Sequence, residues 1–279
     1  MKKIGLFLAI LLLGVLAACG STGEENESAG ESSDTPNERS LSIEDAMGEQ
    51  TIEGIPEDIV VLEWSYAENL LALGMQPAGV ADVDGYNQWV NIDKELDDSV
   101  VDVGTRQEPN LEAISRLDPD LIIAVKYRHE AHLDALNDIA PVVTFAPYGE
   151  EAVQDQYQNM INEFEKMATI VDKEAEAEQV LTDLDSFVEE QKQRIAEAGL
   201  EGNSYIATQA FTAQNAPTLR LFTNNSIVAQ VINSLGLENA YQSDTLETYG
   251  YSEVNVEALQ NFQGENLEFL YIVQEEDNI

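Results

Sequence analysis

The sequence predicts an α/β fold of two Rossmann-like lobes joined by a single long helix. Short β-branched runs alternate with helical periodicity early in the chain, residues 152–198 contain neither Gly nor Pro, and motifs of the first half return in the second. Alternation of strands and helices is typical of a mainly parallel sheet covered by helices. We therefore expect two similar lobes on either side of the long helix.

Residues 1–19 have the pattern of a lipoprotein signal peptide. Lys2 and Lys3 precede an apolar stretch that is too short to span a bilayer comfortably, and small residues lead to Cys19, the only cysteine. We expect Cys19 to be lipidated and to anchor the chain at the extracytoplasmic face of the cell membrane. The alternative is an ordinary secretory signal with an incidental cysteine. A single cysteine excludes an intrachain disulfide and a cysteine-based metal site.

Residues 20–45 are expected to be a disordered tether. They are rich in Ser, Glu, Gly and Asn, and such a segment buries too little apolar surface to offset the entropy lost on ordering. The chain as a whole carries 53 acidic and 13 basic residues. This balance makes nucleic acid and anionic membrane surfaces poor partners, and most of the carboxylates are interpreted as solvated surface groups.

The first lobe, residues 46–171, is predicted to contain five strands. Each is a short run rich in β-branched or apolar residues, and amphipathic stretches separate several of them. The predicted strands are Ile59–Leu62, Gly79–Ala81, Val100–Val103, Leu121–Val125 and Val142–Phe145.

Residues 172–199 are predicted to form the connecting helix. Apolar residues between Tyr157 and Met167, and again between Val180 and Val188, follow a 3.6-residue period with one buried stripe. Asp172 lies between the two sets as a candidate N-cap, and Gly199 is suited to end the second helix. We expect two helices, the second from about Lys173 to Ala198.

The second lobe, residues 200–279, repeats motifs of the first. Asn110-Leu-Glu-Ala-Ile before strand 121–125 returns as Asn255-Val-Glu-Ala-Leu before a predicted strand at 267–273. A strand at 219–222, Ser226 and a helix ending Ser-Leu-Gly236 likewise echo strand 59–62, Ser65 and a helix ending Ala-Leu-Gly74. A period this long excludes a solenoid. The second lobe is short, and we expect it to lack its last elements.

Three segments of residues 55–279 resemble siderophore-binding members of the class III, helical-backbone substrate-binding proteins of ABC importers. They are Leu62-Glu-Trp-Ser-Tyr-Ala-Glu-Asn-Leu-Leu-Ala-Leu-Gly74, Val103-Gly-Thr-Arg-Gln-Glu-Pro-Asn-Leu-Glu112 with the strand after it, and Asn225-Ser226 with Leu235-Gly236. The resemblance implies a lipoprotein that binds a ferric siderophore of the hydroxamate or citrate-hydroxamate class between its lobes. It also implies delivery to an ABC permease, and we expect a monomer. A haem or corrinoid binder of the same fold is the alternative.

A ferric siderophore brings its own oxygen ligands, so we expect no protein–metal bonds and no cofactor. Arginine donors for the oxygens and aromatic surface for the organic shell suit such a ligand. Arg106, Arg128 and Arg220 lie at or just after predicted strand ends, where α/β sheets bind ligands. Arg106 stands in the Val-Gly-Thr-Arg turn. Arg128 and Arg220 have surface salt bridges as an equal alternative.

Four aromatic residues complete the candidate ligand site. Trp64 and Trp89 lie after first-lobe strands, and the resemblance places Trp89 on an aromatic position that lines the cleft. Tyr249, before Gly250, matches a second-lobe aromatic that closes on the ligand. Tyr127 follows strand 121–125 and is included for that reason. A place in the hydrophobic core is the alternative for these side chains, most of all for Trp64.

No enzymatic motif is present, and we expect no catalytic residues. The chain has no Gly-x-Ser-x-Gly elbow and no phosphate-binding loop. His129, Glu130 and His132 have helical spacing for a metal site, but the chain contains no further histidine to complete a ligand shell. We therefore predict no metal site.

Glu112 and Glu257 are candidate docking residues for the permease. They occupy equivalent positions in the repeated motif, each near a predicted helix start, where the helix dipole stabilises an exposed carboxylate. The resemblance implies that such a pair meets arginines of the two permease subunits. The alternative is two helix-start acids without a partner.

Overall fold

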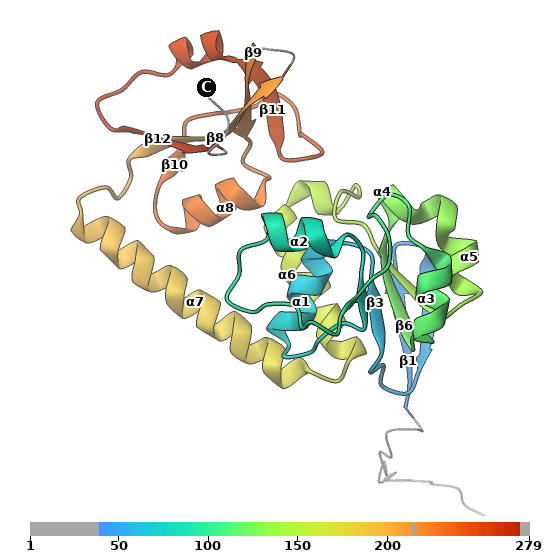
Figure 1. Cartoon of the computed structure of the whole chain (residues 1–279). Helices are drawn as coiled ribbons and strands as arrows, with labels where there is room; N and C mark the ends of the chain where they lie inside the picture. The colour runs from blue at the N-terminus through green and yellow to red at the C-terminus, as the bar shows by residue number, and fades with distance from the viewer. Residues whose placement is uncertain (1–38, 214–215, 274–279) are drawn as a thin grey trace, which may run out of the picture. The chain divides into compact units, whose positions relative to one another are not determined.

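Five short parallel strands form the first sheet, in the order β5-β4-β3-β6-β7. The computed structural model describes residues 39–213 and 216–273, and Figure 1 shows the elements in chain order. Each predicted strand of the first lobe is confirmed to within one residue at either end. The strands are β3 (Ile59–Val61), β4 (Gly79–Val80), β5 (Val101–Asp102), β6 (Leu121–Val125) and β7 (Val142–Phe145).

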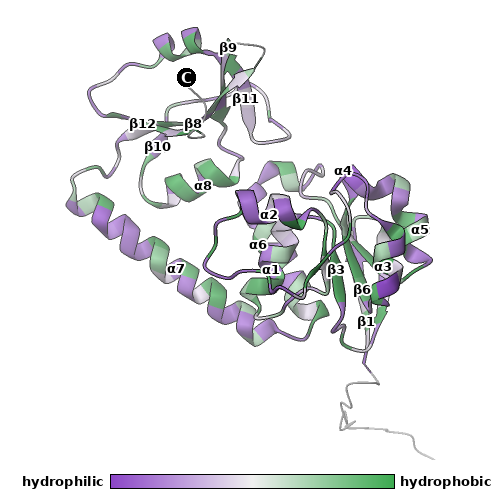
Figure 2. Cartoon of the chain, viewed as in Figure 1, coloured by the Kyte–Doolittle hydropathy of each residue, from purple (hydrophilic) through white to green (hydrophobic). Residues whose placement is uncertain are grey.

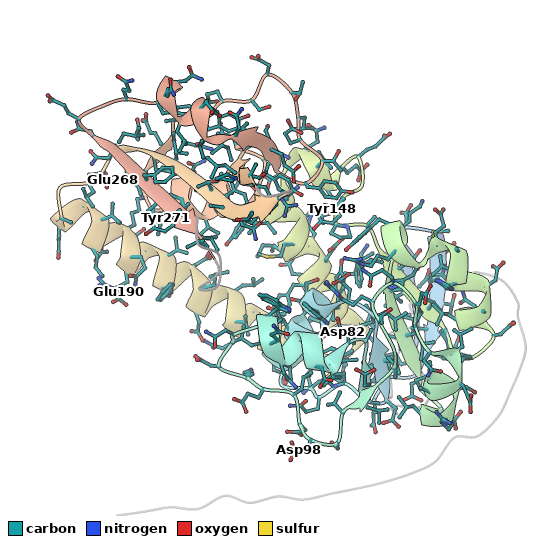
Figure 3. The ribbon with its side chains drawn as sticks, turned by 45° about the horizontal axis from the view of Figure 1, so that its top comes forward. Asp82, Asp98, Tyr148, Glu190, Glu268 and Tyr271 are labelled. Carbon is teal, nitrogen blue, oxygen red and sulfur yellow. The ribbon has the colours of Figure 1, made fainter. Side chains whose placement is uncertain are left out.

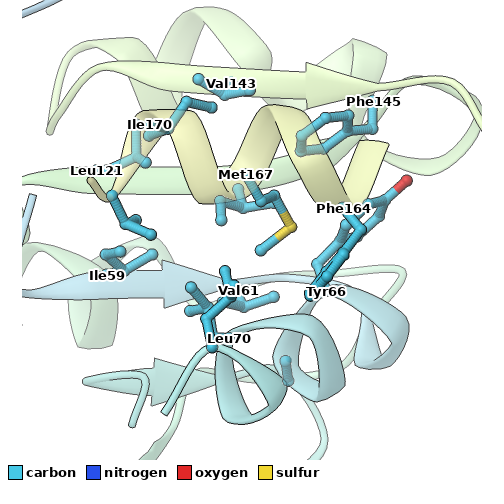
Figure 4. Close-up of a cluster of buried hydrophobic side chains, with 14 of the residues drawn as sticks. Ile59, Val61, Tyr66, Leu70, Leu121, Val143, Phe145, Phe164, Met167 and Ile170 are labelled. Atoms are coloured by element: carbon cyan, nitrogen blue, oxygen red, sulfur yellow. The ribbon is translucent and has the colours of Figure 1, made fainter. Parts of the chain in front are cut away.

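Helices cover both faces of this sheet, which explains why its strands are apolar without alternation. Alternate residues of one strand face opposite ways, so Ile123 belongs to one buried cluster and Ile122 to the other. On the first face Met167 of α6 packs among strand residues, as Figure 4 shows. The helices of this region are α1 (Trp64–Ala72), α2 (Val83–Trp89), α3 (Leu111–Leu117), α4 (Lys126–His129), α5 (Leu133–Asn137) and α6 (Gln156–Ile170), with 3-10 turns η1 (Glu130–His132) and η2 (Ala152–Gln154).

An antiparallel hairpin precedes the first sheet, where the sequence predicted a tether. Strand β1 (Ser40–Asp45) pairs with β2 (Gly48–Glu53), and the turn between them bonds to β7 through the Ala46 amide and the Thr144 carbonyl, 2.9 Å apart. The predicted tether, residues 20–45, is therefore wrong from residue 40 onward. The hairpin was missed because its strands alternate polar and apolar residues weakly. Residues 20–38 and the signal peptide with Cys19 lie outside the described residues.

Two helices follow the first sheet, as predicted, but Asp172 has a different place. It is not the N-cap of α7 (Glu174–Glu197); it has a φ of 59° and lies just past the end of α6. The Lys173 amide bonds to the Ala168 carbonyl at 2.8 Å, the pattern of a helix that ends in a left-handed residue. Gly199, at φ 72°, lies just past the end of α7 as expected.

Helix α7 is long and largely exposed, and Figure 2 shows many hydrophilic residues along its ribbon. The predicted buried stripe along it is only partly buried beyond the first turns, and Phe187 does not belong to it. Val180 and Leu181 pack against the first core, whereas Phe187 is 59% exposed. In the described part of the chain, no helix combines the length and apolarity that a bilayer crossing requires.

The second sheet is mixed, so it is not an all-parallel copy of the first. Its path is β10-β8-β9-β11, with β12 also paired to β8, and β9 runs antiparallel to both neighbours. All described residues lie in one compact unit. The elements are β8 (Ser204–Ala213), β9 (Ala216–Phe222), α8 (Ile227–Ser234), β10 (Glu238–Asn239), β11 (Tyr251–Asn255), η3 (Val256–Asn261) and β12 (Leu267–Ile272).

The two echoed motifs differ in how well the structure preserves them. Helices α1 and α8 both end in a leucine followed by a glycine with positive φ, Gly74 at 80° and Gly236 at 90°. The other pair diverges, because Asn110 caps α3 through the Ala113 amide whereas Asn255 starts a 3-10 helix without a side-chain cap.

Candidate functional site

A pocket of about 490 Å³ lies at the carboxyl ends of β3, β6 and β7. The carboxyl edge of a parallel sheet is where open α/β folds bind ligands, because the strand-to-helix loops converge there. Glu63 follows β3, Tyr127 and Arg128 follow β6, and Tyr148 follows β7. The charged and aromatic lining residues are Glu63, Trp64, Tyr66, Glu68, Arg106, Tyr127, Arg128, Tyr148, Glu163 and Tyr249.

Glu63 joins the two arginines of the pocket. Its carboxylate accepts from Arg106 Nη1 at 2.6 Å and from Arg128 Nε at 2.8 Å, and the Tyr127 hydroxyl donates to it at 3.1 Å. The side chain also accepts from the Trp64 amide at 3.3 Å, which makes Glu63 the N-cap of α1. Glu63 is only 7% exposed. The pocket therefore contains a buried, fully bonded carboxylate between two guanidinium groups.

The charge state of this cluster follows from its bonds. Burial acts to raise the pKa of Glu63, but the hydrogen bonds and charges of Arg106 and Arg128 outweigh it, so the pKa lies below its ordinary value. Burial, followed by the Glu63 charge, raises the pKa of Tyr127 to about 12. At neutral pH the carboxylate is ionised and the phenol keeps its proton.

Arg106 is held from several directions. Its guanidinium lies 3.7 Å from the centre of the Trp64 ring, a cation–π contact. Its loop begins at Gly104, which has a φ of 96° and where a Cβ would lie 2.7 Å from the Asn110 amide. This positive φ and the close approach of the backbone require glycine at the turn.

His129 holds the backbone of Arg106. Its ring is fully buried, Nδ1 accepts from the Val125 amide at 3.0 Å, and Nε2 lies 2.7 Å from the Arg106 carbonyl. This pairing requires the neutral tautomer with the proton on Nε2. Burial lowers the pKa of His129, which favours that form. The histidine thus connects the end of β6 to the Arg106 loop.

An aromatic series continues from the pocket into the second region of the chain. Tyr127 and Tyr148 meet edge to face with centroids 5.2 Å apart, and Tyr148 meets Tyr249 in the same way at 5.0 Å. Tyr249 is 55% exposed. Figure 3 shows Tyr148 among the side chains of the structure. The series offers flat apolar surface beside the arginines.

Two predicted ligand residues lie outside the pocket lining. Trp89 ends α2 and is 55% exposed. Arg220 on β9 bonds to Glu253 on β11 at 3.0 Å and stacks on Tyr251, with its guanidinium 4.6 Å from the ring centre. Their roles in binding stay predictions.

Glu112 and Glu257 are both exposed, in α3 and η3. The Glu112 side chain forms an i,i+4 ion pair with Arg116 at 3.0 Å, and a pair this exposed contributes little to stability.

His129 and His132 do not form a metal site with Glu130. The buried His129 ring uses both nitrogens on the backbone, and within residues 39–213 and 216–273 no group of three or more His, Cys, Asp or Glu is arranged to hold a metal ion.

Sequence reasoning missed Glu63, His129 and Tyr148 as site residues. Glu63 could have been found, since it is the one acid between the buried strand Ile59–Leu62 and an apolar helix. A carboxylate buried at such a position needs a hydrogen-bond or ion-pair partner. Tyr148 carried no such signal because its loop has no regular pattern.

Comparisons with known proteins show the family to which the chain belongs. The periplasmic binding protein family model (Peripla_BP_2) matches residues 59–274. The chain is 31% identical over 261 residues to the Fe(3+)-citrate-binding protein YfmC of Bacillus subtilis, covering 92% of this chain and 76% of the relative. It is 31% identical over 234 residues to the Probable siderophore-binding lipoprotein YfiY of the same organism, covering 84% and 66%.

A solved structure shares the fold. The crystal structure of the Fe3+-Desferal-bound siderophore-binding protein FhuD from Vibrio cholerae superposes with a TM-score of 0.70 and 32% identity, covering 80% of each chain. The family consists of binding proteins, which agrees with the expectation of no enzymatic activity. On the family match and these identities, the chain belongs to the periplasmic binding protein family.

Proposed function

We propose that this protein captures a ferric siderophore in the pocket around Glu63, Arg106 and Arg128 and delivers it to an ABC importer. The observation that carries the proposal is the buried Glu63 carboxylate that fixes two guanidinium groups beside an aromatic wall. Relatives named for Fe(3+)-citrate and for siderophores support it.

The pocket chemistry fits a complex whose iron is already saturated by oxygen ligands. Each arginine donates one N–H to Glu63 and keeps its other N–H groups for an acceptor, and a guanidinium pairs well with carboxylate or hydroxamate oxygens. Trp64 and the tyrosines supply surface for the organic shell.

The proposed architecture is a Rossmann-like lobe with a parallel sheet, residues 46–171, and a second lobe with a mixed sheet, residues 200–279, joined by a helix at 172–199, with the ligand in the cleft between them. Support comes from the pocket lining, which takes Ile227 and Tyr249 from the second region as well as residues of the first. A single helical connection favours small closure movements.

We propose that the protein is lipid-anchored through Cys19 at the extracytoplasmic face of the cell membrane. The small residues before a lone cysteine at the end of an export segment support this. Cys19→Ser should release the protein from the membrane fraction or leave it uncleaved. Unchanged membrane attachment would rule the anchor out.

We also propose that Glu112 and Glu257 dock on arginines of the permease. Charge pairs at an interface rim mainly tune encounter and register. The double variant Glu112→Arg/Glu257→Arg should therefore lose uptake of labelled ferric siderophore while keeping ligand binding. Normal uptake at matched expression would contradict the docking role.

Titration of intrinsic Trp and Tyr fluorescence tests the proposed ligand class. Ferric dicitrate, ferric trihydroxamates, haem and cobalamin are compared on the purified protein. We expect saturable quenching by at least one ferric complex, with haem and cobalamin without effect. Saturation by haem or cobalamin alone would support the alternative binder of the same fold.

A further inference from the structure

The Glu63 carboxylate has no bonding capacity left for a ligand. A carboxylate offers about four lone-pair sites. Oε1 accepts from Arg106 Nη1 and the Trp64 amide, and Oε2 accepts from Arg128 Nε and the Tyr127 hydroxyl. Glu63 lines the pocket, but its side chain is only 8% exposed and four protein donors occupy its two oxygens.

Each arginine, by contrast, is only partly used. Arg106 gives Glu63 a single terminal nitrogen, and Arg128 gives it Nε, so Nη groups of both remain for another acceptor. Both arginine side chains are partly accessible, at 24% and 22% exposure. One buried anion therefore determines the spacing and the orientation of two accessible cations.

We propose that Glu63 is a positioning residue, which holds Arg106 and Arg128 at the separation that the oxygen atoms of a ferric complex require. The inference rests on the proposed function and adds a role for a residue that does not touch the ligand. Binding then gains from preorganisation, since neither long side chain must be ordered when the ligand arrives.

If Glu63 acted only through its charge, its removal would change ligand affinity in the opposite direction. Removing a carboxylate beside two arginines makes the pocket more positive. By Coulomb's law alone, this would strengthen the binding of an anionic ligand and leave the binding of a neutral ligand unchanged. Positioning predicts weaker binding of either kind of ligand. The sign of the affinity change therefore separates the two explanations.

Glu68→Gln provides the matched control. Glu68 also lines the pocket, but it has no hydrogen bond or ion pair to either arginine among the described contacts. The same charge is removed from the same pocket without disturbing the arginines. Because Glu68 lines the same pocket, its variant reports the effect of the lost charge, and Glu63→Gln should weaken binding more than Glu68→Gln does.

The experiment measures dissociation constants of wild type, Glu63→Gln and Glu68→Gln by fluorescence titration for an anionic complex, ferric dicitrate, and a neutral one, ferric N-acetyl-desferrioxamine B. For the complex that wild type binds more tightly, Glu63→Gln should weaken binding at least tenfold. Unchanged or tighter binding by Glu63→Gln would overturn the positioning role. A wild type that binds no ferric complex would instead overturn the proposed function.

A structure of the wild-type complex gives a test that does not depend on folding of the variant, which a circular-dichroism melt checks. In that complex both Glu63–arginine contacts should persist while the ligand bonds to other guanidinium nitrogens. Departure of Glu63 from both arginines on ligand binding would overturn the inference.

Discussion

The two sheets of this protein differ in how their side chains are buried. In the described residues, the first sheet supports clusters of 21 and 12 buried apolar residues on its two faces, whereas the second supports clusters of four and three. Parallel strands covered on both faces bury every side chain of Leu121–Val125. In β12, Tyr271 is 64% exposed. The first sheet is the rigid frame of the molecule.

The same contrast holds for the candidate site. Glu63 and His129 are buried and fix the arginines of the first region through short hydrogen bonds. In the second region, Arg220 pairs with a half-exposed Glu253, and Tyr249 is exposed. Preorganised donors therefore lie in the first region, and more adaptable surface in the second.

The largest expected difference between the regions is in stability. Leu121 and Leu221 are both fully buried, but Leu121 lies in the larger core. We expect Leu121→Ala to lower the free energy of unfolding by about 4 kcal/mol and Leu221→Ala by about 2 kcal/mol, since a sparse core relaxes more easily around a cavity.

Urea unfolding followed by two probes measures this difference. Both tryptophans lie in the first region, so their fluorescence reports on it, while circular dichroism reports on the whole chain. Equal losses of unfolding free energy in the two variants would show that the second core relaxes around a cavity no more easily than the first.

The next difference is in binding. Arg106→Ala should weaken ferric-siderophore binding by about 1.5–3 kcal/mol, because charge-assisted hydrogen bonds from a preorganised donor are lost. Arg220→Ala should weaken binding by less than about 1 kcal/mol, since Arg220 lies outside the pocket lining and its guanidinium is already paired with Glu253. Calorimetric titration of both variants measures this. A larger loss for Arg220 would reverse the assignment of the main binding surface.

The smallest effect concerns pH and His129. Its folded pKa lies below its ordinary value of 6.5, so the unfolded chain takes up a proton first as pH falls. The neutral ring therefore contributes its full share of folding stability above about pH 6.5, and this contribution decreases at lower pH. The variant His129→Gln should not show this part of the loss of stability at low pH. Burial raises the pKa values of Glu68 and Glu163, so these groups increase folding stability as pH falls. They do so equally in wild type and in His129→Gln. Parallel stability profiles of wild type and variant between pH 7 and 5 would contradict the prediction.

Much of the fold could be predicted from the sequence because its strongest signals are local. Leu121–Val125 is continuously apolar, and the end of α7 at Gly199 has a local glycine signal. The hairpin at Ser40–Glu53 was missed because its strands contain few apolar residues. The antiparallel pairing of β9 with β8 was missed because the repeated motifs indicated a second sheet like the first.

The site was predictable where strand ends carry charged residues. Arg106 and Arg128 were found in this way, and both line the pocket. Glu63, which bonds to both, has a local signal in its place between a buried strand and an apolar helix, but its partners lie 43 and 65 residues away in the chain and its role was missed. Trp89, which was predicted in a loop, ends α2 and lies outside the pocket lining, and its role in binding stays a prediction.

Anomalous scattering at the iron edge, from crystals grown with a ferric siderophore, tests the central claim most directly. The account predicts one iron position inside the pocket lined by Arg106, Arg128 and Tyr249, with every iron ligand from the siderophore. Iron coordinated by protein carboxylates, or located in the acidic hollow lined by Glu44, Glu150 and Glu151, would contradict it.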